Sequence, residues 1–312
     1  MTDERDEIDD DVDVFEQSVT EQVFEPDQRW TTLPSSAMLS LEDADELLRW
    51  REASVIAVVG ERNGGKTTLV AEIYERFLRG PFADTFFCHS LSLLGFEMKS
   101  FQSRAESGAE RPDTPRTSAQ DGLRFFHLAV SDESDFQRRT DLLISERAGE
   151  IYREIRDNPE RAVEMIELRK AAAIAFIIDG ERVLDARKRA EVFASTRHII
   201  RALDETGTIK PGTKVQLVTT KLDLLDGAEA AAALEALTEF ENRLIAAFGG
   251  TYQVSAFRTA ARDPDGVVDP ATGLAPLLRS WLTPPQPLPI DDVVQPDLTD
   301  EFDRLLLRGM LQ

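Results

Sequence analysis

A glycine-rich turn between an apolar run and a helical pattern limits this 312-residue chain to few folds. The run ASVIAVVG, residues 53–60, is typical of a buried strand, and TTLVAEIYERFLRG, from residue 67 onward, has helical periodicity. Between them GERNGGKT, residues 60–67, fills the pattern GxxxxGK followed by Ser or Thr. Such a turn lets successive backbone N–H groups surround a phosphate at the positive end of a helix. The sequence therefore predicts a phosphate-binding loop in an α/β domain.

Each residue type in this loop suits a nucleotide phosphate. Glycines let the backbone come close, Lys66 can reach the β- and γ-phosphate oxygens, and the Thr67 hydroxyl can bind Mg²⁺. We expect Lys66 to serve catalysis as well as binding. The residues predicted to contact the nucleotide here are Gly60, Glu61, Arg62, Asn63, Gly64, Gly65, Lys66, Thr67 and Thr68.

Strand-like and helix-like segments alternate over residues 30–283, which favours a mainly parallel sheet with helices on both faces. Further strands are expected at residues 85–90, 123–130, 141–145, 173–179, 214–220 and 251–256. Helices are expected after an N-cap at Ser40 and at residues 160–171, 187–205, 227–247 and 274–282. We predict a doubly wound P-loop NTPase domain over residues 30–283.

Composition separates the two ends of the chain from this domain. Residues 1–29 carry 12 acidic and 2 basic side chains with few large apolar ones, so we predict a disordered acidic tail. Residues 284–312 begin as a Pro-rich linker and end in a helical pattern, which either packs on the domain or docks a partner. The polar residues 103–121 are expected to form a long loop that is either functional or disordered.

Charge, apolar length and cysteine content exclude several classes of protein. The net charge of -22 disfavours nucleic acid and anionic membranes as partners. The sequence has no run of about 18 apolar residues, the length of a membrane-spanning helix. Cys88 is the single cysteine, so no internal disulfide can form, and the first residues lack the pattern of a secretion signal. We expect a cytoplasmic protein.

Two segments resemble the base-recognition motifs of GTPases. TKLD, residues 220–223, follows an apolar strand as the motif Asn/Thr-Lys-x-Asp does in those proteins. The Asp223 carboxylate can accept hydrogen bonds from N1–H and the 2-amino group of guanine, which adenine does not offer, and the Lys221 stem can lie along the base. SA, residues 255–256, resembles the loop whose backbone N–H contacts guanine O6. The predicted base contacts, which favour guanine over adenine, are Thr220, Lys221, Asp223, Ser255 and Ala256.

The segment ERAG, residues 146–149, resembles the DxxG motif of the same proteins. The resemblance implies that the acid holds Mg²⁺ through a water and that the N–H of Gly149 senses the γ-phosphate. Glu146 is one methylene longer than Asp, so either the metal shell rearranges or Mg²⁺ binding weakens. Glu150 stands where many GTPases place a glutamine that orients the attacking water, and it either acts on that water or is an ion-paired surface residue.

A threonine of the long loop is expected to contact the γ-phosphate and Mg²⁺. Thr117, shortly before the strand at residues 123–130, is the best candidate and Thr114 is nearly as good, although either could be an ordinary loop hydroxyl. Ordering of this loop by the γ-phosphate and Mg²⁺, and its release after hydrolysis, would be the switch.

Three more residues each leave two interpretations open. Asn63 resembles the asparagine that holds K⁺ near the phosphates in potassium-activated GTPases, or it only stabilises the turn. Arg62 points at phosphate or is solvated. Asp179, at the end of a strand, caps the next turn or approaches the nucleotide.

Together these segments resemble the translation-factor-related (TRAFAC) GTPases. GERNGGKTTL, FFCHSLSLLGFEMKSFQSR, FHLAV, SERAGEIY, AFIIDGERVLD and TTKLD resemble more closely the bacterial double-GTPase families of GTPase-associated conflict systems. The resemblance implies a Mg²⁺-dependent, GTP-driven switch or effector with slow intrinsic turnover, encoded beside partners such as a second GTPase, in defence against phage. Two alternatives stay open: a GTP-binding scaffold without hydrolysis, favoured by Glu146, and a P-loop ATPase or kinase, disfavoured by Asp223.

Overall fold

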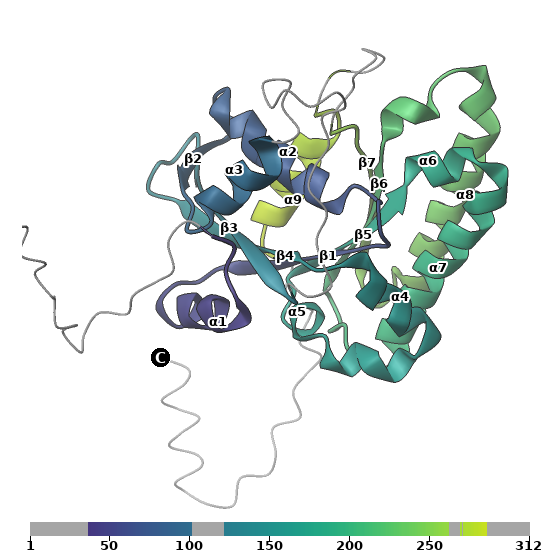
Figure 1. Ribbon diagram of the computed structural model, residues 1–312, viewed down its shortest axis with the longest axis horizontal. Helices are drawn as coiled ribbons and strands as arrows, with labels where there is room; N and C mark the ends of the chain where they lie inside the picture. The colour runs from purple at the N-terminus through teal and green to yellow at the C-terminus, as the bar shows by residue number, and fades with distance from the viewer. Residues whose placement is uncertain (1–36, 102–121, 262–268, 270, 286–312) are drawn as a thin grey trace, which may run out of the picture. The chain divides into compact units, whose positions relative to one another are not determined.

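A seven-stranded sheet forms the centre of the protein (Figure 1). Its strands are β1 (Ser54–Val59), β2 (Thr85–His89), β3 (Arg124–Asp132), β4 (Arg139–Glu146), β5 (Ala173–Asp179), β6 (Lys214–Thr220) and β7 (Gln253–Arg258). They lie in the order β2-β3-β4-β1-β5-β6-β7. Strands β4, β1, β5, β6 and β7 are parallel, whereas β3 is antiparallel to both β2 and β4. The mainly parallel sheet predicted from the sequence is therefore confirmed.

The computed structural model describes residues 37–101, 122–261, 269 and 271–285. All of them belong to one compact unit, Leu33–Gln312. The acidic tail, the loop with Thr114 and Thr117, and the C-terminal helical pattern lie outside the described residues. The interpretations placed on these segments, and the domain limits, stay predictions. Among the described residues, no helix has both the length and the apolar content needed to cross a bilayer.

Helices cover both faces of the sheet. They are α1 (Leu41–Trp50), α2 (Lys66–Leu78), α3 (Leu93–Phe101), α4 (Gly149–Asp157), α5 (Ile166–Arg169), α6 (Gly180–Leu184), α7 (Ala186–Glu205), α8 (Ala231–Phe248) and α9 (Leu274–Leu282). Short 3₁₀ turns occupy Pro159–Glu164, Leu222–Leu225 and Ala228–Ala230. Helices α2, α3 and α9 pack on one face, and α4, α7 and α8 pack on the other (Figure 1). The predicted two-sided architecture is confirmed.

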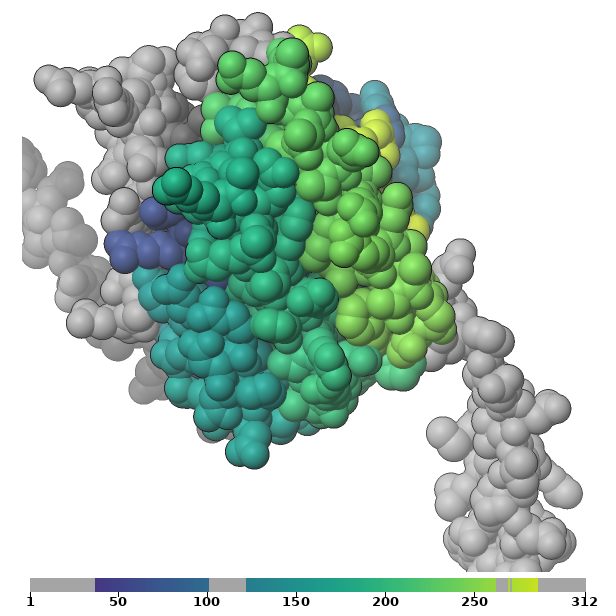
Figure 2. All heavy atoms as spheres, turned by 90° about the vertical axis from the view of Figure 1, so that its right-hand side faces the viewer, coloured from purple at the N-terminus to yellow at the C-terminus, as the bar shows by residue number. Residues whose placement is uncertain are grey.

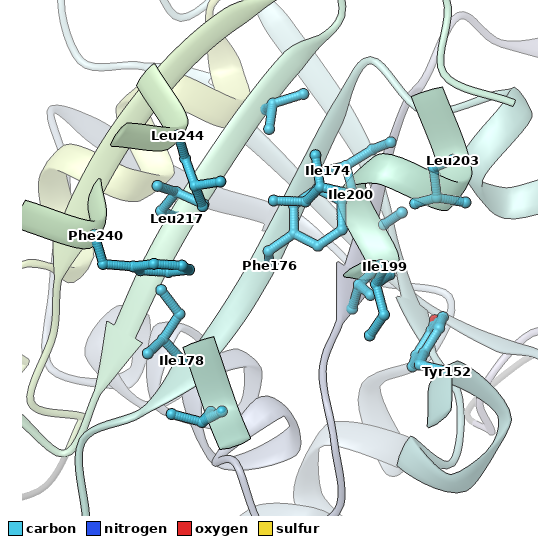
Figure 3. Close-up of a cluster of buried hydrophobic side chains, with 14 of the residues drawn as sticks. Tyr152, Ile174, Phe176, Ile178, Ile199, Ile200, Leu203, Leu217, Phe240 and Leu244 are labelled. Atoms are coloured by element: carbon cyan, nitrogen blue, oxygen red, sulfur yellow. The ribbon is translucent and has the colours of Figure 1, made fainter. Parts of the chain in front are cut away.

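Alternation of side chains along the strands builds two core layers. In β1, Ile56 and Val58 pack into the layer under α2, whereas the next residues along the strand pack into the layer under α7. Figure 3 shows the second layer, where Phe176 of β5, Ile199 of α7 and Phe240 of α8 gather. Because both faces are covered, β5 and β6 are buried along their whole length. The carboxyl ends of these strands are thereby held at one edge of the sheet.

Local patterns explain where the helices agree with expectation and where they differ. Ser40 caps α1 as expected, because its hydroxyl accepts from Asp43 N–H at 3.2 Å and its own N–H donates to the Asp43 carboxylate at 2.8 Å. The helix expected over residues 160–171 is instead a 3₁₀ turn followed by α5, since the backbone of Met165 is not helical. The pattern did not predict α3, α4 or α6.

Candidate functional site

The turn over residues 60–65 joins the carboxyl end of β1 to the start of α2. Two of its residues have left-handed backbone conformations, Asn63 with φ 62° and Gly65 with φ 84°. Glycine and asparagine adopt this conformation most readily, so Asn63 suits the turn. Gly65 is the N-cap of α2 and offers no side chain to cap it. The first N–H groups of α2, with Thr67 and Thr68 in its first turn, can therefore donate to a phosphate.

Lys66 lies inside this turn and bonds its backbone. The Lys66 Nζ donates to the carbonyl oxygens of Gly60 at 2.9 Å and Glu61 at 3.0 Å. Its side chain is buried, and burial lowers the pKa of Lys66, although the charges of Glu146, Glu150 and Glu61 oppose that effect. The ammonium is thus held at the centre of the loop.

The acid of the ERAG segment meets the threonine of the loop. Glu146 ends β4 and is buried, and its Oε1 accepts a hydrogen bond from the Thr67 hydroxyl at 2.5 Å. The additional methylene of glutamate therefore still brings the carboxylate to the hydroxyl. Carboxylate and hydroxyl oxygens are the hard donors that Mg²⁺ prefers, and one or two carboxylates plus phosphate commonly complete such a site. The residues present fit a magnesium ion.

The same segment presses against the phosphate loop at Gly149. A Cβ at this position would lie 2.4 Å from the Arg62 nitrogen and 2.5 Å from the Glu61 carbonyl carbon, so only glycine fits without displacement. Next to it, Glu150 forms an ion pair with Arg62, whose Nε lies 3.6 Å from the Glu150 Oε1. The structure thus gives Glu150 the ion-paired role, while a role toward water stays a prediction.

A cavity of about 510 Å³ opens beside the loop. Arg62, Asn63 and Glu150 line it together with residues of α6 and α7. Glu61 also lines it, but its carboxylate bonds to Arg182 of α6 and to a serine of α7. The loop therefore offers a nucleotide the backbone of Glu61 rather than its carboxylate. The sequence does not predict this, because the direction of a loop side chain depends on the helices packed beneath it.

The end of β6 brings the TKLD segment to the loop. The Thr220 hydroxyl donates to the Gly64 carbonyl oxygen at 2.8 Å and ties the two segments together. Lys221 has a left-handed backbone with φ 53°, and its Nζ lies 3.0 Å from the carboxylate of Asp179 and 2.7 Å from that of Glu181. Burial alone would lower the pKa of Lys221, but these carboxylates outweigh it and raise the pKa.

Asp223, the last residue of this segment, and Asp179, the last residue of β5, were also expected near the site. Asp223 lies partly exposed in the 3₁₀ turn Leu222–Leu225, directly after Lys221. Asp179 caps α6 by accepting from the Glu181 N–H at 3.1 Å, which is the capping role considered from the sequence. Thr220, Lys221 and Asp223 are therefore grouped at the edge that holds the phosphate loop.

Ser255 and Ala256 are not brought to this edge. They lie within β7, opposite Gln216 and Leu217 of β6, and the strand continues to Arg258. The small pair is followed by Phe and Arg, which extend the strand past the position expected for a loop. The segment that reaches the edge is instead residues 259–261, where Thr259 N–H donates to the Thr219 carbonyl oxygen at 2.7 Å. A second small-residue stretch, TAA, marks it in the sequence.

Comparison with known proteins places these features in a family context. A family model described as Double-GTPase 2 matches residues 54–282. No curated protein matches the chain.

Solved structures of low sequence identity also match. The chain is similar to the SRb-GTP/SRX complex of the signal recognition particle receptor from Chaetomium thermophilum, at 16% identity and a TM-score of 0.39, covering 81% of this chain and 97% of that chain. It is similar to elongation factor SelB of Methanococcus maripaludis with the GTP analogue GPPNHP, at 12% identity and a TM-score of 0.37, covering 76% and 36%. It is also similar to the GTP-bound GTPase-like domain of S. cerevisiae Ski7, at 13% identity and a TM-score of 0.40, covering 76% and 51%. The chain thus spans about a third of the SelB chain and about half of the Ski7 chain.

Proposed function

The chain belongs to the Double-GTPase 2 family, and on this premise we propose that it binds GTP and GDP and hydrolyses GTP to GDP and phosphate. One observation carries the proposal: the Lys66 ammonium lies within the turn that opens α2, directly before the Thr67 hydroxyl, which bonds the Glu146 carboxylate. These are the groups that a nucleoside triphosphate with Mg²⁺ requires: an ammonium for the phosphates, and a hydroxyl and a carboxylate for the metal ion.

Each group of the site has a part in the proposed reaction. Lys66 and the first N–H groups of α2 hold the phosphates by charge and hydrogen bonds. Thr67 and Glu146 would hold Mg²⁺, which neutralises charge on the phosphates when bound. Gly149 offers its N–H to the γ-phosphate, and Thr117 stays our candidate for a second contact. Arg62 is paired with Glu150, so its charge is partly compensated, and we expect slow turnover by the isolated chain.

We propose that the base is guanine. Asp223 follows Lys221 at the edge of the sheet and supplies the acceptor, and the backbone of residues 259–261 replaces Ser255 and Ala256 as the segment facing the base. Substitution Asp223→Asn should weaken GTP binding and strengthen binding of xanthosine triphosphate. The reason is that the new side-chain amide donates a hydrogen bond to the 2-oxo group, which xanthine carries in place of the 2-amino group of guanine.

Competition titrations with GTP, ATP and xanthosine triphosphate check this prediction. Asp226→Asn, which changes an exposed acid just after the same 3₁₀ turn, is the control and should leave all three affinities unchanged. Equal displacement of GTP by ATP, or unchanged GTP binding by the Asp223 variant, would contradict guanine recognition.

We further propose that the protein acts as a cytoplasmic switch or effector with protein partners, a second GTPase among them, in a bacterial defence system. The support is the family membership and the chain's single cysteine, Cys88, which is exposed. Measuring both GTP turnover and GTP affinity separates an enzyme from a scaffold, because binding of GTP without turnover would identify a GTP-binding scaffold. Faster turnover in K⁺ than in Na⁺ is the result expected if Asn63 has the potassium role.

A further inference from the structure

The carboxylate of Glu61, second in the phosphate loop, is held by side chains of three helices. Its Oε1 accepts from the Ser195 hydroxyl at 2.5 Å, and its Oε2 accepts from the Arg182 guanidinium at 2.5 Å. Arg153 and Arg156 of α4 place guanidinium nitrogens 3.8 Å from its two oxygens. The Glu61 side chain is 11% exposed, so these groups rather than water surround it.

The charge of Glu61 is maintained in this setting. Burial alone would raise the pKa of Glu61, but the hydrogen bonds from Ser195 and Arg182 and the charges of Arg182 and Arg153 outweigh it and lower the pKa. A buried carboxylate is tolerated only where such partners compensate its lost hydration. The charged carboxylate of Glu61 thus bonds the phosphate loop to α4, α6 and α7.

The backbone of the same residue contacts the groups assigned to the γ-phosphate. The Glu61 carbonyl oxygen accepts from Lys66 Nζ at 3.0 Å. On its other side, the peptide that joins Glu61 to Arg62 is in direct contact with Gly149, where a Cβ would lie 2.5 Å from the Glu61 carbonyl carbon. One peptide therefore touches both Lys66 and Gly149, while the Glu61 side chain is paired with arginines of α4, the helix that begins at Gly149.

We propose that Glu61 is a positioning residue, which through Arg182, Ser195 and the α4 arginines holds this peptide where Lys66 and Gly149 can both contact a γ-phosphate. The inference rests on the proposed GTP site. It also links occupancy of that site to α4, which lies beside α7 on the face shown in Figure 2.

The test compares affinities for GDP and a non-hydrolysable GTP analogue in the full chain. Glu61→Gln keeps the size of the side chain and removes its charge. We expect affinity for the analogue to fall about tenfold, within the usual range of coupling between sites, and affinity for GDP to change less than about twofold. Glu61→Asp, which restores the charge, should recover part of the loss.

Glu191→Gln is the matched control. Glu191 lies 3.6 Å from Arg153 and 3.2 Å from Arg182, so it shares two of the arginines of Glu61, but it belongs to α7 and not to the loop. The control should bind both nucleotides as the wild type does. An equal loss for GDP and the analogue in Glu61→Gln, or no loss for either, would overturn the inference.

A second variant keeps the test valid should Glu61→Gln not fold. Arg153→Gln combined with Arg156→Gln leaves the Glu61 bonds to Arg182 and Ser195 in place and removes the link to α4. In the wild type, hydrogen exchange in α4 should slow more with the GTP analogue than with GDP, and the double variant should lose this difference. A wild type that binds neither nucleotide would refute the GTP site itself, whereas nucleotide binding with an unchanged α4 response in the double variant would refute only the positioning role.

Discussion

Gly149 shows how one missing side chain shapes the site. Its neighbours are backbone atoms of Glu61 and Arg62, which cannot turn aside as a flexible side chain could. The contact keeps the segment that follows β4 against the phosphate loop. In the proposed GTP site this contact would place the Gly149 N–H near the γ-phosphate, so the close packing and the proposed phosphate contact would both depend on the absence of a Cβ at this position.

We predict that Gly149→Ala destabilises the protein by about 1–3 kcal/mol, the usual cost of overpacking. Urea unfolding checks this prediction. Gly250→Ala is the control, because a Cβ at Gly250 has no described atom within 4 Å, and it should leave the unfolding free energy almost unchanged. Equal effects of the two substitutions would show that the loop moves away from residue 149 at little cost.

Fixed spacings in the sequence predicted which residues lie together, whereas their roles stay predictions. The loop and the TKLD segment are marked by such spacings, and the structure brings Lys66, Thr67, Glu146 and Thr220 together. Ser255 was misplaced because the strand limit, which no spacing encodes, lies at Arg258. The anchoring of Glu61 depends on arginines about 90–120 residues away in the chain, so local sequence could not reveal it.

At the scale of elements, the buried carboxylate of Asp141 links the antiparallel strands β3 and β4. Asp141 of β4 accepts from His127 of β3 at 3.0 Å and from Arg139 at 2.7 and 2.8 Å. His127 accepts the Leu91 N–H at its Nδ1, so its Nε2 carries the proton donated to Asp141. One cluster therefore joins β3, β4 and the segment that leads into α3.

This cluster predicts a pH dependence of stability. Burial alone would raise the pKa of Asp141, but His127 and Arg139 outweigh it and lower the pKa to about 2. A carboxyl group whose pKa is lowered in the folded protein stabilises the fold at every pH above its ordinary pKa. That contribution is lost as the pH falls from about 4 toward 2. The wild type should therefore lose about 2 kcal/mol over this window that Asp141→Asn does not lose.

Urea unfolding at about pH 6 and about pH 3 measures about half of this loss, about 1 kcal/mol, because pH 3 lies midway through the window. Linkage requires the difference in unfolding free energy between wild type and variant to narrow in acid. Glu133→Gln, at an exposed position between β3 and β4, serves as the control. A gap that stays constant between the two pH values would contradict the role given to Asp141.

Strands were predicted better than helices, for physical reasons. The central strands are apolar runs because both faces are covered, and their expected limits lie within one or two residues of β1, β5 and β6. Helix α6 has five residues, too few for a periodic pattern to stand out, and it begins at the cap of Asp179. Helix α4 has nine residues, as many as α9, whose limits the pattern predicted, but α4 begins at the tight contact of Gly149.

At the scale of the whole molecule, the topology places the site. From β1 the chain crosses to β2, β3 and β4 on one side, whereas from β5 it crosses to β6 and β7 on the other. Ligands of open α/β sheets bind outside the carboxyl ends of strands at such a switch point. The phosphate loop after β1, Glu146 at the end of β4 and Thr220 at the end of β6 meet there.

Calorimetric titration of the full chain with GTP and GDP in the presence of Mg²⁺ is the most direct test that this edge binds a guanine nucleotide. We predict binding of both by the wild type, and affinity roughly 10- to 100-fold weaker for Lys66→Ala, because charge-assisted hydrogen bonds to phosphate are lost. Lys210→Ala, at an exposed lysine distant in sequence from the loop, should bind as the wild type does. No heat with either nucleotide, or unchanged affinity in the Lys66 variant, would contradict the account.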